Sequence, residues 1–474
     1  MSTTIVKDAI RTINPASGEK IHDHAPHSHE QVEHILTGAR DAFPAWRALG
    51  FDGRAEIIQR VAVHLRKHKS SFAEIATHEM GKPIVEAEAE VEKCAWACEY
   101  FAERAVTFLA DEIAETNAAK SYVAFRPIGA VLAIMPWNFP YWQVFRFAAP
   151  ALMAGNVAVL KHAGIVTGCS LEIERIFEVC GAPAGVFGSL LVPGSAMDRI
   201  VGDHRIAAVT LTGSEGAGSA VASVAGKMIK KTVLELGGSD AFIVLADADL
   251  EAAAATAVRA RFQNDGQSCI AAKRFIVEDG VYDDFLARFV AKTKELVVGD
   301  PMDRATQLGP LAREDLRDAI SRQVDESVAR GAKLVLGGKR IDRSGFFYEP
   351  TIVGDVTDAM PLFREETFGP AAAVIRARDA EHAVALANDS TFGLGGNLWT
   401  RDVPRAEKLA ERLESGNVFI NGMTASDPRL PFGGVKRSGY GRELSAYGIR
   451  EFVNAQTVWI GPAKADRQQF RPAE

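Results

Sequence analysis

Cysteine is scarce in this sequence, and its cysteines lack the pairing that metal sites and disulfide frameworks require. The chain of 474 residues has five of them, an odd number, and no two form a CxxC pair. A zinc site or a small disulfide scaffold is therefore not expected, and reduced thiols in a cytoplasmic protein are the expectation instead. The five are Cys94, Cys98, Cys169, Cys180 and Cys269.

An excess of basic charge and long apolar runs are also missing. The formal net charge is −7, which argues against nucleic acid or an anionic membrane surface as the main partner. No apolar run is long enough to span a bilayer, and the stretch MSTTIVKDAIRTINPASGEK lacks the apolar region of a secretory signal. We therefore expect neither nucleic acid nor a membrane among the partners.

The composition that remains is that of an ordinary globular protein, with 47% hydrophobic and 24% charged residues. A chain of this length exceeds one compact core, which predicts two or three domains. From residue 121 onward, apolar strand-like runs alternate with helix-length segments, and a second such series follows residue 269. This alternation predicts two doubly wound α/β units with parallel sheets and right-handed crossovers.

The first hundred residues are patterned mainly as helices. Ser28 and Gln31 form a capping-box pattern, apolar residues then recur at helical spacing, and Gly81 predicts a helix end. Cys94 and Cys98 stand four apart on one helix face, where burial is the commoner role of cysteine. The stretch HDHAPHSHE holds four histidines; we interpret it as a surface turn, with a metal site as the alternative.

Cys269 differs from the other cysteines in its surroundings. It lies in RFQNDGQSCIAAKR, where Asn264 and Gly266 belong to a polar run within apolar sequence. A free thiol has a pKa of about 8.5, so a nucleophilic cysteine needs backbone N–H groups, a helix N-terminus or a base nearby. Cys169 and Cys180 fall instead on an apolar-patterned helix and its end. If one thiol is catalytic, Cys269 is the candidate; a buried structural cysteine is the alternative.

A second candidate segment is MPWNFPYWQVFRFAAPALMAGN. Pro140 predicts the first turn of a helix, and Asn138, Trp142 and Arg146, spaced four apart, are expected on one face. An asparagine amide at a helix N-terminus is a ready donor to a developing oxyanion. Arg146 is the only charge between Asn138 and Lys161. A cation in so apolar a segment needs an anion, either a structural carboxylate or a substrate.

Two further segments place polar groups at strand ends. RIAAVTLTGSEGAGSAVA predicts a strand, a turn with Gly213 and Ser214, and a helix whose start could hold a pyrophosphate, although the spacing is not GxGxxG. VLELGGSDAFIV puts Glu235 at the end of an apolar strand, where burial would raise its pKa toward that of a general base. FGGVKRSGYGRE looks like a phosphate loop but lacks the spacing, which favours a structural turn.

Taken in order, these segments resemble the aldehyde dehydrogenase superfamily over nearly the whole chain. The matching motifs are INPASGE, PWNFP, AGNVAVLK, TLTGS, LELGGSDAF, GQSC, EETFGP and LPFGGVKRSGYGRE. Within the superfamily, NFPYWQVFRFAAPALMAGN followed by LKHA is most similar to bacterial succinate-semialdehyde dehydrogenases. The resemblance implies a cofactor domain of residues 1–116 and 138–237, a catalytic domain of residues 238–437, and small oligomerisation strands in residues 117–137 and 450–474.

The resemblance also implies roles for single residues. Cys269 matches the nucleophile, Asn138 with the backbone N–H of residue 269 matches the oxyanion hole, and Glu235 matches the base that activates water. The implied cofactor contacts are Trp137, Lys161, Gly213, Ser214, Glu366 and Phe368. The implied substrate contacts are Trp142, Arg146, Gln263 and Ser426, with Arg146 binding a distal carboxylate.

The sequence departs from the pattern of the family in three places. Residues 161–164 read Lys-His-Ala-Gly where Lys-Pro-Ser-Glu is usual, and the missing carboxylate makes room for the 2′-phosphate of NADP+. Gln263 stands where some relatives carry a second carboxylate-binding arginine. Ala271 stands where some carry a second cysteine, which excludes a local disulfide on the nucleophile.

The implied activity is the oxidation of succinate semialdehyde with NADP+ or NAD+ by a homodimer or homotetramer, through a thioester that water hydrolyses. An uncharged or other short aldehyde is the alternative substrate. Two other classes stay open. One is a catalytically silent protein of the same fold, and the other is a cofactor-free cysteine hydrolase, which needs a histidine beside the thiol.

Overall fold

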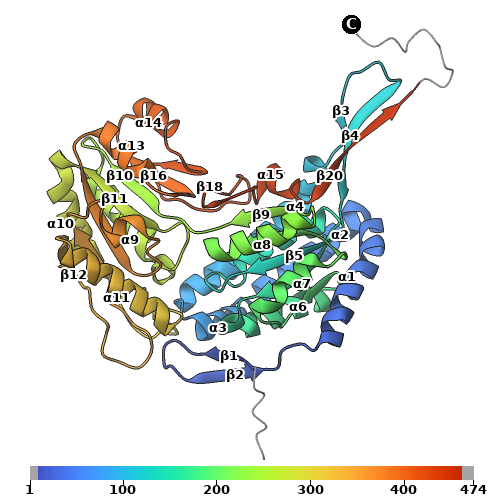
Figure 1. Ribbon diagram of the computed structural model, residues 1–474, viewed down its shortest axis with the longest axis horizontal. Coiled ribbons are helices and arrows are strands. Elements are labelled where there is room, and N and C mark those ends of the chain that lie inside the picture. Colours follow the sequence, from blue (N-terminus) through green and yellow to red (C-terminus); the bar gives the residue numbers. More distant parts are fainter. Residues whose placement is uncertain (1–8, 462–474) are drawn as a thin grey trace, which may run out of the picture.

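The computed structural model describes residues 9–461 as two α/β units side by side, with a β-arm projecting from one of them (Figure 1). Each unit is built on a largely parallel sheet, which confirms the predicted α/β class. The domain bounds themselves stay a prediction. Residues 1–8 of the first segment and residues 462–474 of the last lie outside the described residues.

The first unit contains a six-stranded sheet in the order β19-β9-β8-β5-β6-β7. Five strands are parallel and β19 joins β9 antiparallel. The strands are β5 (Ala130–Met135), β6 (Val157–His162), β7 (Phe187–Ser189), β8 (Ile206–Thr212), β9 (Lys231–Glu235) and β19 (Gly439–Tyr440). Strands buried on both faces read as continuous apolar runs, as these do. Ligands bind at the carboxyl edge of such a sheet, the edge at which β8 and β9 end.

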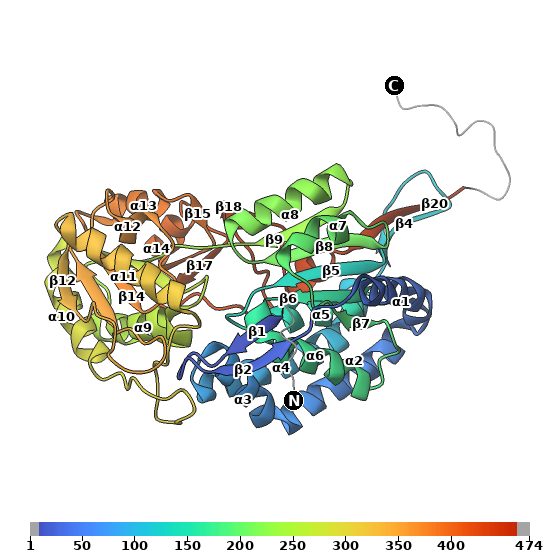
Figure 2. The same cartoon turned by 60° about the horizontal axis from the view of Figure 1, so that its bottom comes forward.

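Helices cover both faces of this sheet, with α7 and α8 above it and α4 and α5 below it in Figure 2. The helices of the unit are α1 (His29–Ala48), α2 (Gly50–Lys67), α3 (Lys69–Met80), α4 (Ile84–Phe108), α5 (Trp142–Met153), α6 (Thr167–Val179), α7 (Met197–Gly202) and α8 (Glu215–Lys227). The predicted capping box at Ser28 is present. Gly81 ends α3 in the left-handed conformation with φ of 87°, and Cys94 and Cys98 are buried in α4, as predicted.

The second unit contains a seven-stranded sheet in the order β12-β13-β14-β11-β10-β16-β17, parallel except for β12. Its strands are β10 (Asp240–Val244), β11 (Ala272–Glu278), β12 (Lys333–Leu336), β13 (Thr351–Gly354), β14 (Ala371–Ala377), β16 (Gly395–Trp399) and β17 (Asn417–Ile420). Its helices are α9 (Leu250–Phe262), α10 (Tyr282–Thr293), α11 (Glu314–Ala329), α12 (Pro361–Arg364), α13 (Ala380–Asn388) and α14 (Val403–Ala410). Ala241 and Ile243 of β10 pack into one apolar core, while Phe242 and Val244 pack into another. Helices therefore cover both faces of this sheet too.

The remaining elements lie outside the two large sheets. The arm is an antiparallel sheet of β3 (Glu112–Ile113), β4 (Lys120–Pro127) and β20 (Val453–Ile460). Two short strands that pair with each other and one helix also lie outside the large sheets: β15 (Phe392–Gly393), β18 (Val435–Lys436) and α15 (Ser445–Ile449). Within residues 9–461, no helix combines the length and the apolar character needed to cross a bilayer.

Two predictions about local structure were wrong in part. The histidine-rich stretch is not only a turn, because β2 (Lys20–His24) pairs antiparallel with β1 (Ile10–Ile13), which supplies the backbone partners that a turn would lack. Helix α5 begins at Trp142 and not at Pro140. Glu90 sets this start, since its carboxylate accepts hydrogen bonds from the backbone N–H groups of Tyr141 and Trp142, both at 2.8 Å.

Candidate active site

Cys269 sits on a loop whose shape is fixed by buried hydrogen bonds. The loop follows α9 through a 3-10 turn, η3 (Gln263–Gly266), in which Asn264 and Asp265 adopt left-handed conformations with φ of 54° and 58°. Such strain costs about 1–3 kcal/mol per residue and persists only where the surroundings impose it. Here the backbone N–H of Asn264 donates to Glu86 at 2.6 Å, and Asp265 accepts from Gly309 at 2.6 Å. Lys273 then holds the Cys269 carbonyl at 2.7 Å.

The side chain of Asn138 is tied to the same loop. Its amide donates to the carbonyl of Gln267 at 2.9 Å, and its side-chain oxygen accepts from Gln143 at 3.0 Å. An amide has two N–H groups, so one remains to donate toward the cavity that Asn138 borders together with Cys269. The backbone N–H of Cys269 has no hydrogen-bond acceptor within residues 9–461. Both donors that the sequence predicted for an oxyanion hole are therefore free.

Cys269 is the meeting point of two cavities. One has a volume of about 390 Å³ and is bordered by Trp137, Asn138, Gly213 and Phe368, among others. The other has a volume of about 610 Å³ and extends along α4 and α5. Cys269 borders both, so its sulfur can be reached from either side. Cys94, Cys98, Cys169 and Cys180 are buried, which leaves Cys269 as the accessible thiol of the described chain.

The Cys269 thiol is nevertheless protonated at rest. Enclosure by the protein raises its pKa to about 12, although the cations of Arg146 and Lys273 lower it. The carboxylates of Glu366 and Glu235 raise it further. Because the thiolate is the reactive form of cysteine, a nucleophilic role for Cys269 requires removal of that proton.

Glu235 ends β9 and is 2% exposed. It does not border either cavity, and its carboxyl oxygens have no hydrogen-bond partner within the described chain. Burial and repulsion from Glu443 raise its pKa well above the usual range, while Arg146 lowers it. A carboxyl group with a raised pKa and free oxygens suits a general base.

The smaller cavity has the features of a dinucleotide groove. Ser214 caps the N-terminus of α8, where its hydroxyl accepts from Ala217 at 3.3 Å, and such a terminus favours a phosphate. Trp137 and Phe368 pack edge to face with ring centroids 5.7 Å apart and form an aromatic wall of this cavity. Glu366 borders the groove and is held by Gly238 and Lys273 at 3.0 and 3.5 Å.

A separate hollow of about 170 Å³ lies beside β6 and is bordered by Lys161 and Gly164. Lys161 makes no ion pair within residues 9–461, and burial lowers its pKa. A side chain at Gly164 would meet Ile10 at 2.9 Å, so the β1–β2 hairpin closes over this position. The hollow thus offers one unpaired cation and no carboxylate at residue 164, which fits an extra phosphate group.

The larger cavity brings together the residues predicted to bind substrate. Trp142, Arg146, Gln263 and Ser426 all border it. Arg146 is 3% exposed, forms an ion pair with Glu443 and donates to Thr212 at 3.2 Å. The sequence left two anions open for Arg146, a structural carboxylate or a substrate. The structure shows the structural carboxylate, Glu443, and Arg146 still borders the cavity.

Comparison with known proteins decides the family. Residues 3–458 match the family described as "Aldehyde dehydrogenase family". The chain belongs to the aldehyde dehydrogenase family. It is 52% identical over 460 residues to a succinate-semialdehyde dehydrogenase (NADP+) of Mycobacterium avium, covering 96% of this chain and 98% of that one. A second relative, succinate-semialdehyde dehydrogenase (NADP+) 1 of Mycobacterium tuberculosis, is 51% identical over 454 residues, with 95% and 99% coverage.

A solved structure agrees with these sequence matches. The crystal structure of succinic semialdehyde dehydrogenase from Streptococcus pyogenes in complex with NADP+ is similar to this aldehyde dehydrogenase with a TM-score of 0.93. The two are 38% identical, and the match covers 95% of this chain and 100% of that chain. The fold class and the resemblance predicted from the sequence are thereby confirmed.

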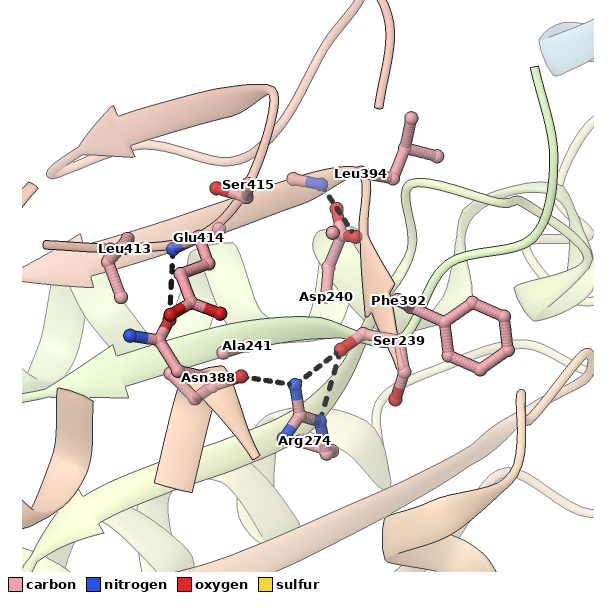
Figure 3. Close-up of a pocket in the computed structure, with 14 residues that line it drawn as sticks. Ser239, Asp240, Ala241, Arg274, Asn388, Phe392, Leu394, Leu413, Glu414 and Ser415 are labelled. Carbon is pink, nitrogen blue, oxygen red and sulfur yellow. Dashed lines mark hydrogen bonds between the residues drawn. The ribbon is translucent and has the colours of Figure 1, made fainter. Parts of the chain in front are cut away.

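One further hollow of this aldehyde dehydrogenase is too small to be a substrate site. It lies at the start of β10 and measures about 20 Å³, room for about one water. Figure 3 shows the guanidinium of Arg274 directed at the carbonyl of Ser239, to which it donates at 2.9 and 3.1 Å. Asp240 accepts from Gly395 at 2.9 Å. These bonds brace the segment between Glu235 and β10.

Several residues at the site were missed from the sequence. Gln143 and Arg146 are the two polar side chains, apart from the indole of Trp142, in the apolar helix α5, a signal that could have marked Gln143 as well. Glu443 lies in the stretch interpreted as a structural turn, where β19 pairs with the end of β9 beside Glu235. Arg313 and Leu316 border the smaller cavity, but no motif singles them out.

Proposed function

We propose that this aldehyde dehydrogenase oxidises succinate semialdehyde to succinate with NADP+. The observation that carries the proposal is the position of Cys269 between the smaller cavity, which suits a dinucleotide, and the larger cavity, which is bordered by basic side chains. Aldehyde carbon and hydride acceptor can then meet at one sulfur. The names of the three similar proteins described above support the same substrate and the same cofactor.

The proposed reaction begins at the Cys269 sulfur. The Cys269 thiol releases its proton to solvent as the sulfur adds to the aldehyde carbon, and the oxyanion formed accepts hydrogen bonds from Asn138 and from the backbone N–H of Cys269. The bound cofactor supplies the hydride acceptor. Loss of hydride leaves a thioester on Cys269, Glu235 takes a proton from water, and the water oxygen displaces the thiol to release the acid.

The remaining residues hold the two ligands. Lys161, Gly213 and Ser214 would bind the adenosine and pyrophosphate portion, and Trp137, Glu366 and Phe368 would enclose the nicotinamide ribose and ring. The aldehyde chain would lie between Trp142 and Gln263, with its distal carboxylate directed toward Arg146 and Ser426.

We also propose that the enzyme forms a homodimer or homotetramer through the arm. Apolar side chains there are exposed, including Ile113 (72%), Trp459 (45%) and Ile460 (46%), and an open antiparallel sheet invites pairing with another copy. A cytoplasmic location stays a prediction from the unpaired cysteines.

The substrate proposal predicts a strong preference for a carboxylate on the aldehyde. With NADP+ present, kcat/KM for succinate semialdehyde should exceed that for butanal, which has the same chain length, by about 100-fold or more, since a charged group that is recognised by paired donors contributes 2–5 kcal/mol. Steady-state production of NADPH, followed at 340 nm for both aldehydes, measures the ratio. A ratio near one would support an enzyme for uncharged aldehydes instead.

The cofactor proposal predicts that NADP+ is the better cofactor. A carboxylate at residue 164 would repel the 2′-phosphate, so Gly164→Glu should lower kcat/KM for NADP+ by about tenfold or more and leave that for NAD+ less affected. Gly164→Gln is the matched control, because its side chain meets Ile10 equally but carries no charge. Strict preference of the unaltered enzyme for NAD+ would refute the proposal.

A further inference from the structure

The larger cavity is bordered by one half-buried cation that makes no ion pair. Four basic side chains border the cavity: Lys93, Arg146, Arg259 and Arg304. Arg146 is paired with Glu443, and Arg304 is paired with Glu88 at 2.9 Å. Arg259 is exposed to solvent. Lys93, on α4, is half-buried and makes no ion pair within residues 9–461.

The ammonium of Lys93 is held in a fixed position by two neighbours. It donates to the hydroxyl of Ser426 at 2.8 Å and lies 4.2 Å from the centre of the Trp142 ring. The indole N–H of Trp142 donates to the same hydroxyl at 3.0 Å. Because that oxygen receives two hydrogen bonds, the Ser426 hydrogen is free to donate. Lys93 has two further N–H groups to offer.

These three side chains therefore present hydrogen-bond donors around one positive charge. Trp142 and Ser426 are 4% and 6% exposed, so the donors are largely shielded from water. Burial lowers the pKa of Lys93 to about 8, as does the cation of Arg146, while Cys94, Asp427 and Glu90 raise it. A bound carboxylate would supply the negative charge that this half-buried ammonium lacks.

We propose that Lys93, together with Ser426 and Trp142, binds the distal carboxylate of the substrate. This inference rests on the proposed function. Some relatives have a second carboxylate-binding arginine at the position of Gln263. Lys93 borders the same cavity from α4 and would supply the second positive charge in its place. The charge of Arg146 is then neutralised by Glu443, and Lys93 supplies a positive charge that is not neutralised by an ion pair.

The test is the Lys93→Met variant, assayed with succinate semialdehyde and with butanal. The KM for succinate semialdehyde should rise roughly 30-fold or more, while kcat/KM for butanal stays within about twofold, since butanal has no carboxylate to lose. Arg259→Met is the matched control, because it removes a cation from the exposed rim and should change neither value. Butanal turnover also reports whether each variant is folded.

A second readout separates binding from packing. In the unaltered enzyme, KM for succinate semialdehyde should rise by about fivefold from pH 8 to pH 9, because the ammonium loses its proton above its pKa. Lys93→Arg stays charged over this range, so its KM should not rise. A KM that is independent of pH in the unaltered enzyme, or a Lys93→Met variant that affects both aldehydes equally, would overturn the role of Lys93. Failure of the unaltered enzyme to oxidise succinate semialdehyde would overturn the proposed function instead.

Discussion

Replacing Cys269 by alanine is expected to lower kcat for aldehyde oxidation by at least about 10⁴-fold, the order seen when a nucleophile is removed from a catalytic unit. No other thiol can substitute, because the remaining four cysteines are buried. NADP+ should still bind, since the groove is formed by other residues, and quenching of tryptophan fluorescence by the cofactor measures that binding. Steady-state NADPH production measures the loss of activity.

The matched control for this experiment is Cys180→Ala. Cys180 lies at the end of α6, and burial raises its pKa, so its removal should leave kcat within about twofold.

The accessible thiol of Cys269 also predicts a pH dependence. Because the pKa of Cys269 is raised to about 12, alkylation of the cofactor-free protein by iodoacetamide should accelerate about tenfold per pH unit from pH 7 to pH 9. If the Cys269→Ala variant still oxidises the aldehyde, Cys269 is not the nucleophile.

The second large effect is expected from Glu235→Gln. Hydride transfer precedes the step that needs a base, so the first turnover should still release NADPH, and hydrolysis of the thioester should slow by about 10³-fold. The progress curve should therefore show a burst of about one NADPH per active site, followed by very slow turnover. Rapid mixing with absorbance at 340 nm resolves the burst from the steady state.

Burial of Glu235 also gives this variant an expected effect on stability. In the folded enzyme its pKa lies well above the usual range, whereas the unfolded chain loses this proton near pH 4.5. Between these values the folded state holds the extra proton, so stability falls as pH rises toward the folded pKa. Glutamine has no proton to lose, and Tm of Glu235→Gln at pH 9 should equal or exceed that of the unaltered enzyme.

Glu79→Gln is the control for a buried carboxyl. Burial raises the pKa of Glu79 to about 7, but the group caps α6 through Gly168 and Cys169, at 2.8 and 3.0 Å, and borders neither cavity. This variant should lower Tm through the lost charge-assisted cap and show steady turnover without a burst. A burst in Glu79→Gln, or none in Glu235→Gln, would contradict the assignment of the base.

Much of the local structure could be predicted because short-range patterns determine it. The Ser28 capping box, the end of α3 at Gly81 and the position of Glu235 at a strand end all depend on residues within a few positions. Cys269 could be singled out for the same reason, since the polar run around it contrasts with the helix that carries Cys169. The start of α5 could not, because a carboxylate on α4 determines it.

The contacts that shape the candidate site are long-range, and no local pattern encodes them. Arg146 pairs with Glu443 from a segment near the C-terminus, and Lys93 and Ser426 are 333 positions apart in the chain. In the sequence, Lys93 is one charged residue among many on an amphipathic helix. Only the packing of α4 against the loop before β18 shows that this ammonium enters the cavity and lacks a carboxylate.

The most direct test of the central claim is mass spectrometry of the Glu235→Gln enzyme, stopped in acid after one turnover with succinate semialdehyde and NADP+. The account predicts that the peptide containing Cys269 gains the mass of one succinyl group, that hydroxylamine removes this mass, and that Cys269→Ala shows none. Release of NADPH in the burst with no acyl group on this peptide, or with the group on another residue, would contradict the account.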